Sequence, residues 1–132
     1  MRRKYLEDLG RKATDNPEGW SVNDNRQEFW KEQRETYGFD ERETWSLDLS
    51  IMLLLYERLM MFNEITEGKT DKTFHEFQYR EETLTLQECL DCMLDSLRYV
   101  LSSNEIENYD MFHIKKQEVF EILALCHSSL WW

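Results

Sequence analysis

The sequence predicts a mainly α protein, a compact bundle of about four helices with a small β-hairpin between the second and third main helices. Four stretches carry apolar residues at the three- and four-residue spacing of helices that bury one face. One proline and four glycines supply too few turns for an all-β sandwich. A hydrophobic content of 41% and an aromatic content of 14% are too high for a disordered acidic chain.

The first predicted helix spans about residues 23–37, and Gly38 ends it. The second begins at Asp40, because Glu43 stands three residues on in a capping-box arrangement. Its apolar residues cover more than one face, so we expect it to be central in the bundle. It ends near residue 66, with Gly68 as the C-terminal stop.

The third predicted helix opens at Thr85 with Glu88 in the capping-box position, and residues 102–104 end it. Its apolar stripe consists of Leu86, Leu90, Met93, Leu94, Leu97, Val100 and Leu101. The fourth helix covers roughly residues 109–128. Its inward face is predicted to carry Phe112, Val119, Phe120, Leu123 and Cys126.

A two-stranded hairpin is predicted between the second and third helices. Phe77 and Tyr79 alternate with polar neighbours, which is the pattern of a half-buried strand. Leu84 lies opposite them if the chain turns at residues 80–82.

The charge is uneven along the chain. The net charge is −11, from 27 acidic and 16 basic residues. Residues 1–36 hold eight of each and sum to zero, so residues 37–132, with 19 acids and eight bases, carry the whole excess. We therefore predict an N-terminal arm with a short helix over residues 1–36 and an acidic helical-bundle domain over residues 37–132.

The same charge bears on partners and location. A strongly acidic body disfavours direct binding to nucleic acid, whose phosphates reward lysine and arginine clusters. The basic start of the chain is not followed by an apolar stretch, which disfavours a secretory signal. The longest apolar run, residues 51–56, is far shorter than the about 20 residues that span a bilayer. We expect a cytoplasmic protein with free thiols and no membrane contact.

The cysteines offer one candidate site. Cys89 and Cys92 form a CxxC, to which Cys126 and His127 could be added as zinc ligands. Redox CxxC pairs stand at a helix start, whereas this pair falls inside the predicted third helix. Adjacent residues 126 and 127 point about 100° apart on a helix, which is poor for joint ligation. The sequence favours small cysteines that line the core.

The acidic residues suggest an enzyme. Glu64 and Glu67 form an ExxE, and Glu88 and Asp91 form an ExxD 20 residues later. Their order and spacing resemble the metal-binding pattern of the all-α nucleotide pyrophosphohydrolases, the MazG-like group. The resemblance implies that these four carboxylates hold Mg²⁺ on a nucleoside triphosphate, as hard oxygen ligands on facing helices would. Without this hypothesis the sequence indicates no cofactor, no metal and no catalytic residue.

Other polar residues have ordinary interpretations. Asp48 interrupts an apolar helix, where it is either a catalytic acid or, as we favour, a carboxylate paired with Arg42, Arg58 or an indole N–H. Asp110 and His113 share a helical face but lack the second Glu-x-x-His pair of a di-iron bundle. The three histidines are therefore predicted to be surface or interface residues.

Several aromatic residues are candidate anchors for a partner. The chain ends in Trp131 and Trp132, which either pack the last helix back onto the second, as we expect, or bind a partner. Phe29, Trp30 and Trp132 are the partner-binding residues that we predict to be exposed.

Part of the chain resembles a group of small uncharacterised phage and prophage proteins. Residues 37–48, YGFDERETWSLD, match their GFDxRxxWxLD helix opening. An ERL–F segment at 57–62, an HxFxY stretch at 75–79 and a tryptophan-rich end at 130–132 follow. The similarity spans about residues 37–132, and the group has no assigned activity.

A phage setting implies a function by protein binding. Small acidic phage proteins often inhibit host enzymes, CRISPR nucleases among them, by occupying basic nucleic-acid grooves. We therefore expect a non-enzymatic, anti-CRISPR-like accessory protein in the host cell cytoplasm, whose partner is a host protein with a basic groove. The alternatives are the Mg²⁺-dependent pyrophosphohydrolase and a virion or assembly component.

Overall fold

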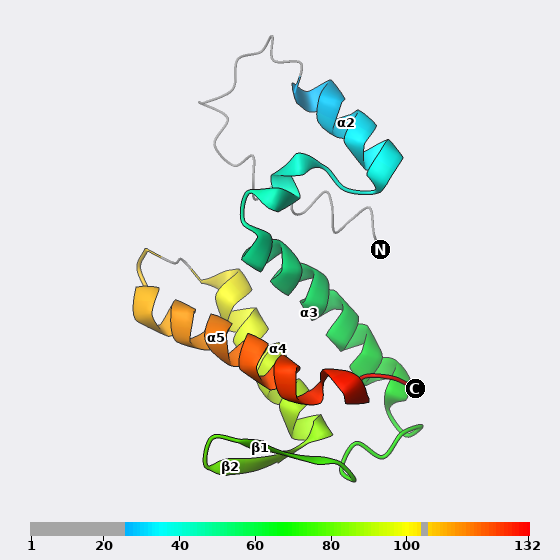
Figure 1. Cartoon of the computed structure of the whole chain (residues 1–132), viewed down its shortest axis with the longest axis vertical. Coiled ribbons are helices and arrows are strands. Elements are labelled where there is room, and N and C mark those ends of the chain that lie inside the picture. The colour runs from blue at the N-terminus through cyan, green and yellow to red at the C-terminus, as the bar shows by residue number, and fades with distance from the viewer. Residues whose placement is uncertain (1–25, 104–105) are drawn as a thin grey trace. The chain divides into compact units, whose positions relative to one another are not determined.

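The computed structural model describes residues 26–103 and 106–132 (Figure 1). The described chain is mainly helical, with four α-helices longer than two turns and one antiparallel hairpin between the second and third of them. The predicted fold class is therefore confirmed. The chain divides into two compact units, one that ends at Leu54 and one from Leu55 to Trp132. The predicted arm and domain, 1–36 and 37–132, stay a prediction, and residues 1–25 of the arm lie outside the described residues.

Helix α2 spans Arg26–Tyr37 and ends where the sequence predicts. Gly38 follows with φ of 83°, a left-handed conformation that glycine adopts without steric cost. The N–H of Gly38 donates to the carbonyl of Arg34 at 2.9 Å, which closes the last turn. Trp30 on this helix is completely buried.

The predicted helix start at Asp40 is wrong. Asp40 caps a short 3₁₀ helix, η2, over Glu41–Thr44, and the α-helix α3 begins only at Leu47 and runs to Thr66. The Asp40 carboxylate accepts the N–H of Arg42, and backbone bonds join residues three apart, as from Trp45 N–H to the Arg42 carbonyl at 3.2 Å. The end at Thr66 is as predicted, and Gly68 follows with φ of 72°.

The hairpin has the predicted register. Strand β1, Glu76–Tyr79, pairs antiparallel with strand β2, Glu82–Thr85, so that Phe77 lies opposite Leu84. Arg80 at the turn has φ of 55°, which is unusual for a side chain with a β-carbon. The hairpin contacts α5 through β1 and α4 through β2 (Figure 1).

Helices α4, Leu86–Ser102, and α5, Tyr109–Cys126, pack against each other. Thr85 and Glu88 form the predicted capping box at the start of α4, with both reciprocal bonds present. The short 3₁₀ helix η3, His127–Ser129, follows α5. The core of this unit is made of Leu59, Leu84, Leu86, Cys89, Leu90, Met93, Leu94, Leu97, Val100, Phe112, Val119, Ile122 and Cys126.

The inward face of α5 differs in part from the prediction. Phe112, Val119 and Cys126 are buried as expected, whereas Phe120 and Leu123 are only half-buried. Ile122, which the prediction omitted, is completely buried. The buried residues 112, 119, 122 and 126 are spaced seven, three and four residues apart and therefore share one face of α5. This buried face is narrower than the set of apolar residues that the sequence places on the helix.

Within the described ranges, no helix combines the length and the apolar character needed to cross a membrane.

Candidate functional site

Two of the three predicted anchors are exposed and one is not. Phe29 and Trp132 are 51% and 64% exposed, as an anchor on the surface must be. Trp30 is 0% exposed, so the prediction that it lies on the surface is wrong. Phe29 and Trp30 are neighbours on α2, and the 100° step between successive helical residues puts one outside and the other in the core. Partner binding by Phe29 and Trp132 stays a prediction.

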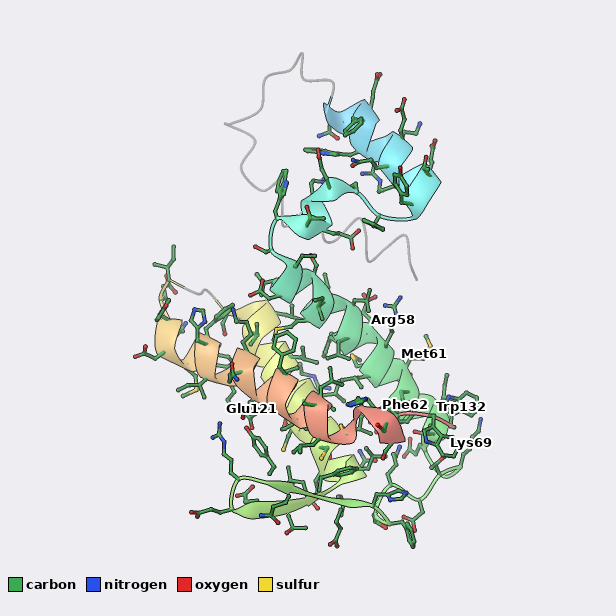
Figure 2. All side chains as sticks on the ribbon, in the orientation of Figure 1. Arg58, Met61, Phe62, Lys69, Glu121 and Trp132 are labelled. Atoms are coloured by element: carbon green, nitrogen blue, oxygen red, sulfur yellow. The ribbon has the colours of Figure 1, made fainter. Side chains whose placement is uncertain are left out.

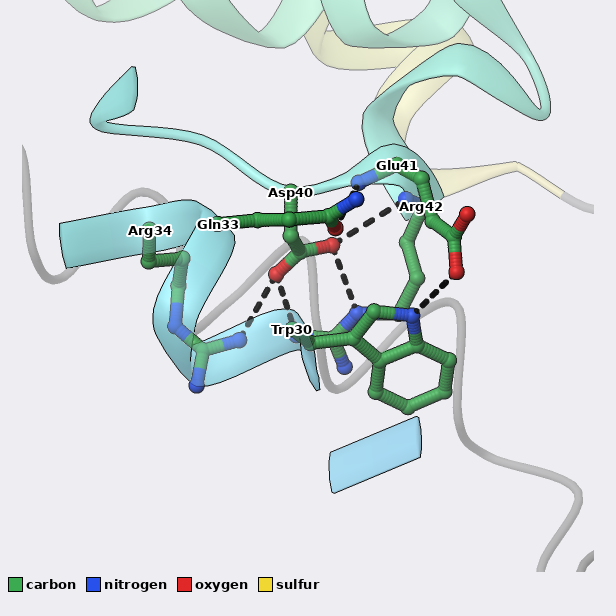
Figure 3. A network of polar contacts seen from close by, with 6 residues as sticks. All are labelled: Trp30, Gln33, Arg34, Asp40, Glu41 and Arg42. Atoms are coloured by element: carbon green, nitrogen blue, oxygen red, sulfur yellow. Dashed lines mark hydrogen bonds and ion pairs between the residues drawn. The ribbon is translucent and has the colours of Figure 1, made fainter. Parts of the chain in front are cut away.

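The buried indole belongs to a polar network in the unit that ends at Leu54 (Figure 3). Its Nε1–H donates to the Glu41 carboxylate at 2.8 Å. The guanidinium of Arg42 stands 4.4 Å from the ring centroid, in a cation–π contact. The amide oxygen of Gln33 accepts the backbone N–H of Glu41 at 3.0 Å, which holds η2 on α2.

Asp40 is the centre of this network. Its buried carboxylate accepts bonds from Arg34 at 2.7 Å and from Arg42 at 2.7 and 2.8 Å (Figure 3). Burial alone raises the pKa of Asp40, but the hydrogen bonds from Arg42 and Arg34 outweigh it and hold the pKa below the ordinary 3.8. The arrangement is a charge-paired structural joint between α2 and η2.

The two terminal tryptophans are largely exposed, whereas burial of both against α3 would fit the predicted packing of the last helix onto it. Trp131 is 73% exposed and Trp132 is 64% exposed, so neither indole is in the core. Trp132 instead holds the ammonium of Lys69 at 5.0 Å from its ring centroid, and Figure 2 shows the two side chains together. A cation–π contact leaves the other ring face open to solvent, which fits the high exposure.

An acidic surface lies on the outer side of α4. Glu88, Asp91 and Asp95 are exposed and recur at three and four, so they share one face of the helix. Burial raises the pKa of the neighbouring Cys92 thiol, and the charges of Glu118, Asp95, Asp91 and Glu82 raise it further. We call this set, Glu82, Glu88, Asp91, Asp95 and Glu118, the α4 acidic surface.

Many of the described basic side chains contact the chain's own acids or aromatic rings. Arg98 pairs with Asp95 at 3.0 Å and stands 5.9 Å from the Tyr56 ring centroid. Lys115 contacts Glu118 at 3.4 Å. The other internal contacts join Arg80 to Glu121 and Tyr79, Lys116 to Phe112, Lys69 to Trp132, and both Arg34 and Arg42 to Asp40. Much of the positive charge is thus used within the fold.

The four carboxylates of the magnesium hypothesis are all exposed. Glu88 accepts the Thr85 N–H in the capping box, and Asp91 accepts a bond from Gln87. In the part of the chain that the structure describes, no three His, Cys, Asp or Glu side chains come close enough to hold a metal ion. Glu64, Glu67, Glu88 and Asp91 are therefore not brought together, and the pyrophosphohydrolase alternative gains no support from the geometry.

The cysteines line the core, as the sequence favours. Cys89 and Cys126 are completely buried and Cys92 is half-buried. Burial raises the pKa of all three thiols, that of Cys126 to about 12, so each is protonated at neutral pH. A protonated thiol is a poor nucleophile and a poor metal ligand.

Three other candidates have local roles. Asp48 is half-buried and accepts the N–H of Leu49 at 2.9 Å in the first turn of α3, where a carboxylate is favourable. His113 contacts two aromatic rings, with ring centroids 4.4 Å from that of Tyr109 and 5.4 Å from that of Phe112. His75 and His127 are exposed, as predicted for surface residues.

Sequence reasoning missed a buried lysine. Lys72 is 7% exposed, and its ammonium contacts the Thr66 hydroxyl at 2.8 Å and both oxygens of Asn63 at 3.5 Å. A cation here complements the carbonyls at the C-terminus of α3. The nearby Gln87 amide donates to the Asn63 side chain at 3.0 Å, which joins this helix end to α4. In the sequence, the one indication of this buried contact is that a lysine follows the predicted helix end by one to two helical turns.

Comparison with protein-family models, curated proteins and solved structures gives no match to this chain. The resemblance of residues 37–132 to small phage proteins therefore stays a prediction. Function must be inferred from the chain's own residues, above all the α4 acidic surface and the exposed aromatic side chains.

Proposed function

We propose that this chain is a non-enzymatic, phage-type accessory protein that binds a host protein and inhibits it. The partner is a nucleic-acid-handling or defence enzyme, and the chain occupies its basic nucleic-acid groove as an acidic mimic. The α4 acidic surface carries the proposal. Glu88, Asp91 and Asp95 of this surface share one side of α4, and Glu82 of β2 and Glu118 of α5 are near the same Cys92 thiol. Asp95 is paired with Arg98 and Glu118 with Lys115, whereas Glu82, Glu88 and Asp91 are exposed.

Electrostatics gives this surface its role. A body with a net charge of −11 is attracted over long range to a positive groove, which raises the rate of association. Asp91 and Asp95 stand one turn apart on a regular helix, so the protein presents them without ordering a loop on binding. The capping box at Thr85 fixes the start of that helix.

The experiment is affinity capture followed by charge substitution. The immobilised protein is exposed to host-cell lysate at low salt, and captured proteins are identified by mass spectrometry. We expect an enzyme with a basic groove that is released as salt rises, because salt screens exposed charges. Purified partner should then lose its nucleic-acid binding when this protein is added.

A matched pair of variants locates the interface. Asp91→Asn with Asp95→Asn removes two exposed charges from α4, and Glu64→Gln with Glu67→Gln removes two from the end of α3 and the turn that follows it. The first should weaken binding by roughly three- to tenfold, at about 0.5 kcal/mol or more per charge, and the second by less. Equal affinity at low and high salt, or equal loss in both variants, would contradict the proposal.

A further inference from the structure

The β-hairpin has one edge that is open to another strand. Strands β1 and β2 pair with each other, and the hairpin contacts α4 and α5 (Figure 1). The helices pack on the side of the hairpin that carries Leu84, which is buried, and Tyr79, which is bonded to Glu121. Glu76 and Gln78 point to the other side of β1 and are exposed. We call the outer edge of the hairpin at these two residues the β1 edge.

The hydrogen bond at the base of the hairpin shows which backbone groups point outward. The N–H of Leu86 donates to the carbonyl of His75 at 3.2 Å, in line with the register of the two strands. Bonded and non-bonded residue pairs alternate along an antiparallel ladder, so Phe77 bonds to β2, whereas Glu76 and Gln78 do not. The N–H and carbonyl groups of Glu76 and Gln78 therefore point away from β2.

The capping box of α4 supports this alternation. Thr85 lies opposite Glu76 in the register, and its N–H donates to the Glu88 carboxylate at 3.2 Å instead of to β1. The edge of β2 is therefore occupied at this end. Among the described residues, no hydrogen bond is made to the outward backbone groups of Glu76 and Gln78. Unpaired N–H and carbonyl groups at two-residue spacing match the backbone of another extended strand.

The charges at the β1 edge are negative. Glu76 on the strand and Glu81 in the turn after it are exposed, and in the described ranges neither carboxylate makes a hydrogen bond or an ion pair. Arg80, which lies between them in the sequence, contacts the Glu121 carboxylate at 3.3 Å, so its charge is already paired. A strand that matches this edge therefore carries basic side chains along an extended backbone.

We propose that the β1 edge binds an extended basic segment of a partner protein as a third strand of the sheet. The backbone of the segment bonds to the N–H and carbonyl groups of Glu76 and Gln78, which supplies the affinity. Its lysines or arginines lie on the same side of the sheet as Glu76, which supplies the selectivity for basic segments. Phe74, 77% exposed and two residues before Glu76, offers an apolar contact at one end. The inference goes beyond the proposed function and does not depend on the α4 acidic surface.

The test uses a designed probe, a peptide of about eight residues in which lysine and valine alternate. The labelled peptide is titrated against the full chain by fluorescence anisotropy, beside one version with N-methylated lysines and one with N-methylated valines. In an added strand, alternate amides face the edge and the others point away from it. We therefore expect saturable binding of the parent peptide, and about tenfold or more loss of affinity in one methylated version but not in the other.

Two proline substitutions separate the β1 edge from the β2 edge. Gln78 and Thr83 lie opposite each other in the register, and both residues are exposed. Gln78→Pro and Thr83→Pro each remove an N–H that is not part of the β1–β2 ladder, where proline is tolerated, and each removes the same side-chain bond between the two residues. We expect about tenfold or more weakening of peptide binding for Gln78→Pro and less than about twofold for Thr83→Pro. Circular dichroism of each variant checks that the fold is retained.

Four outcomes would overturn the inference. No binding of the parent peptide would mean that the edge does not accept a basic strand. Equal affinities of the two methylated peptides, or equal effects of the two prolines, would mean that the peptide binds through charge alone. Sedimentation that shows dimers of the full chain, which Gln78→Pro dissociates and the peptide does not, would assign the edge to a second copy of this chain. Loss of peptide binding in the α4 charge variant with retention in Gln78→Pro would assign the binding to the α4 acidic surface.

Discussion

At the scale of single residues, buried charge is decisive around Asp40. A carboxylate in the interior costs free energy unless it is paired and hydrogen-bonded. Asp40 has both Arg34 and Arg42 as partners, and Arg42 in turn covers the ring of Trp30. One side chain therefore joins the end of α2 to η2 and keeps an indole in the core.

Replacing Asp40 with asparagine should loosen this joint. We expect about 3–5 kcal/mol of destabilisation, because Arg42 keeps its buried charge and loses its counter-charge. Hydrogen exchange followed by mass spectrometry should show faster exchange in peptides from residues 26–45 and unchanged exchange in residues 86–102. The control is Asp95→Asn, which breaks an exposed ion pair with Arg98 and should cost at most about 1 kcal/mol. A similar effect of both substitutions would contradict this account.

The same joint sets a response to acid. The pKa of Asp40 is lower in the folded chain than its ordinary 3.8. The ionised Asp40 carboxylate therefore contributes fully to the free energy of unfolding above pH 3.8. This contribution is lost as the pH falls through the pKa that Asp40 has in the folded chain, which is lower than 3.8. The loss should be visible in wild type as increased exchange of residues 26–45 and absent in Asp40→Asn.

At the scale of elements, caps and cross-links decide where helices begin and how they are held. The Thr85 hydroxyl accepts the N–H of Glu88, and the Glu88 carboxylate accepts the N–H of Thr85. The Tyr79 hydroxyl donates to the Glu121 carboxylate at 2.8 Å, and Arg80 contacts the same oxygen at 3.3 Å. The hairpin is thus fixed to α5, which matters because two strands alone are marginally stable.

Thr85→Ala should destabilise the fold by about 1 kcal/mol, with a range of about 0.5–2, because the first turn of α4 loses its side-chain cap. Chemical denaturation followed by circular dichroism measures the change. Thr83→Ala is the matched control, because Thr83 is an exposed strand residue whose hydroxyl, within the described part of the chain, bonds to the exposed Gln78 side chain and caps no helix. The account fails if the control is the more damaging substitution.

Tyr79→Phe should destabilise the hairpin contact by about 1.5–3 kcal/mol, the range for a hydrogen bond to a charged acceptor. Burial and the bond to Glu121 raise the pKa of Tyr79 from 10.0 to about 12. The folded chain therefore favours the neutral phenol of Tyr79. The contribution of this phenol to the free energy of unfolding is complete below pH 10 and is lost as the pH rises through about 12. Absorbance titration of the tyrosines should lose its most alkaline step in Tyr79→Phe. An unchanged titration would contradict the bond.

At the scale of the whole molecule, charge is the dominant property. The chain has 27 acids and 16 bases, and several of the bases contact aromatic rings or acids within the fold. Like charges on one folded body repel one another and oppose compaction. The excess of negative charge, which favours binding to a basic partner, therefore also lowers the stability of the free protein.

Salt should accordingly stabilise the free protein. Raising sodium chloride from about 0.01 M to about 0.5 M shortens the screening length from roughly 30 Å to under 10 Å, which reduces repulsion among the acids. We expect the Tm to rise by about 2–5 °C, the equivalent of up to about 1 kcal/mol. Calorimetry at the two salt concentrations measures it. A fall in Tm would mean that the exposed ion pairs outweigh the repulsion.

The sequence by itself determined the helical class, most helix ends, the capping box at Thr85 and the hairpin register, because these depend on local spacing, caps and glycines. Tertiary structure alone decided that Trp30 is buried and Phe29 exposed, that η2 precedes α3, and that Lys72 is inside. An apolar pattern shows that a helix has an inner side, but which aromatic side chain fills the core depends on what packs against it. The pairing of Asp40 with Arg34 and of Tyr79 with Glu121 likewise forms only when separate elements meet, 6 and 42 residues apart along the chain.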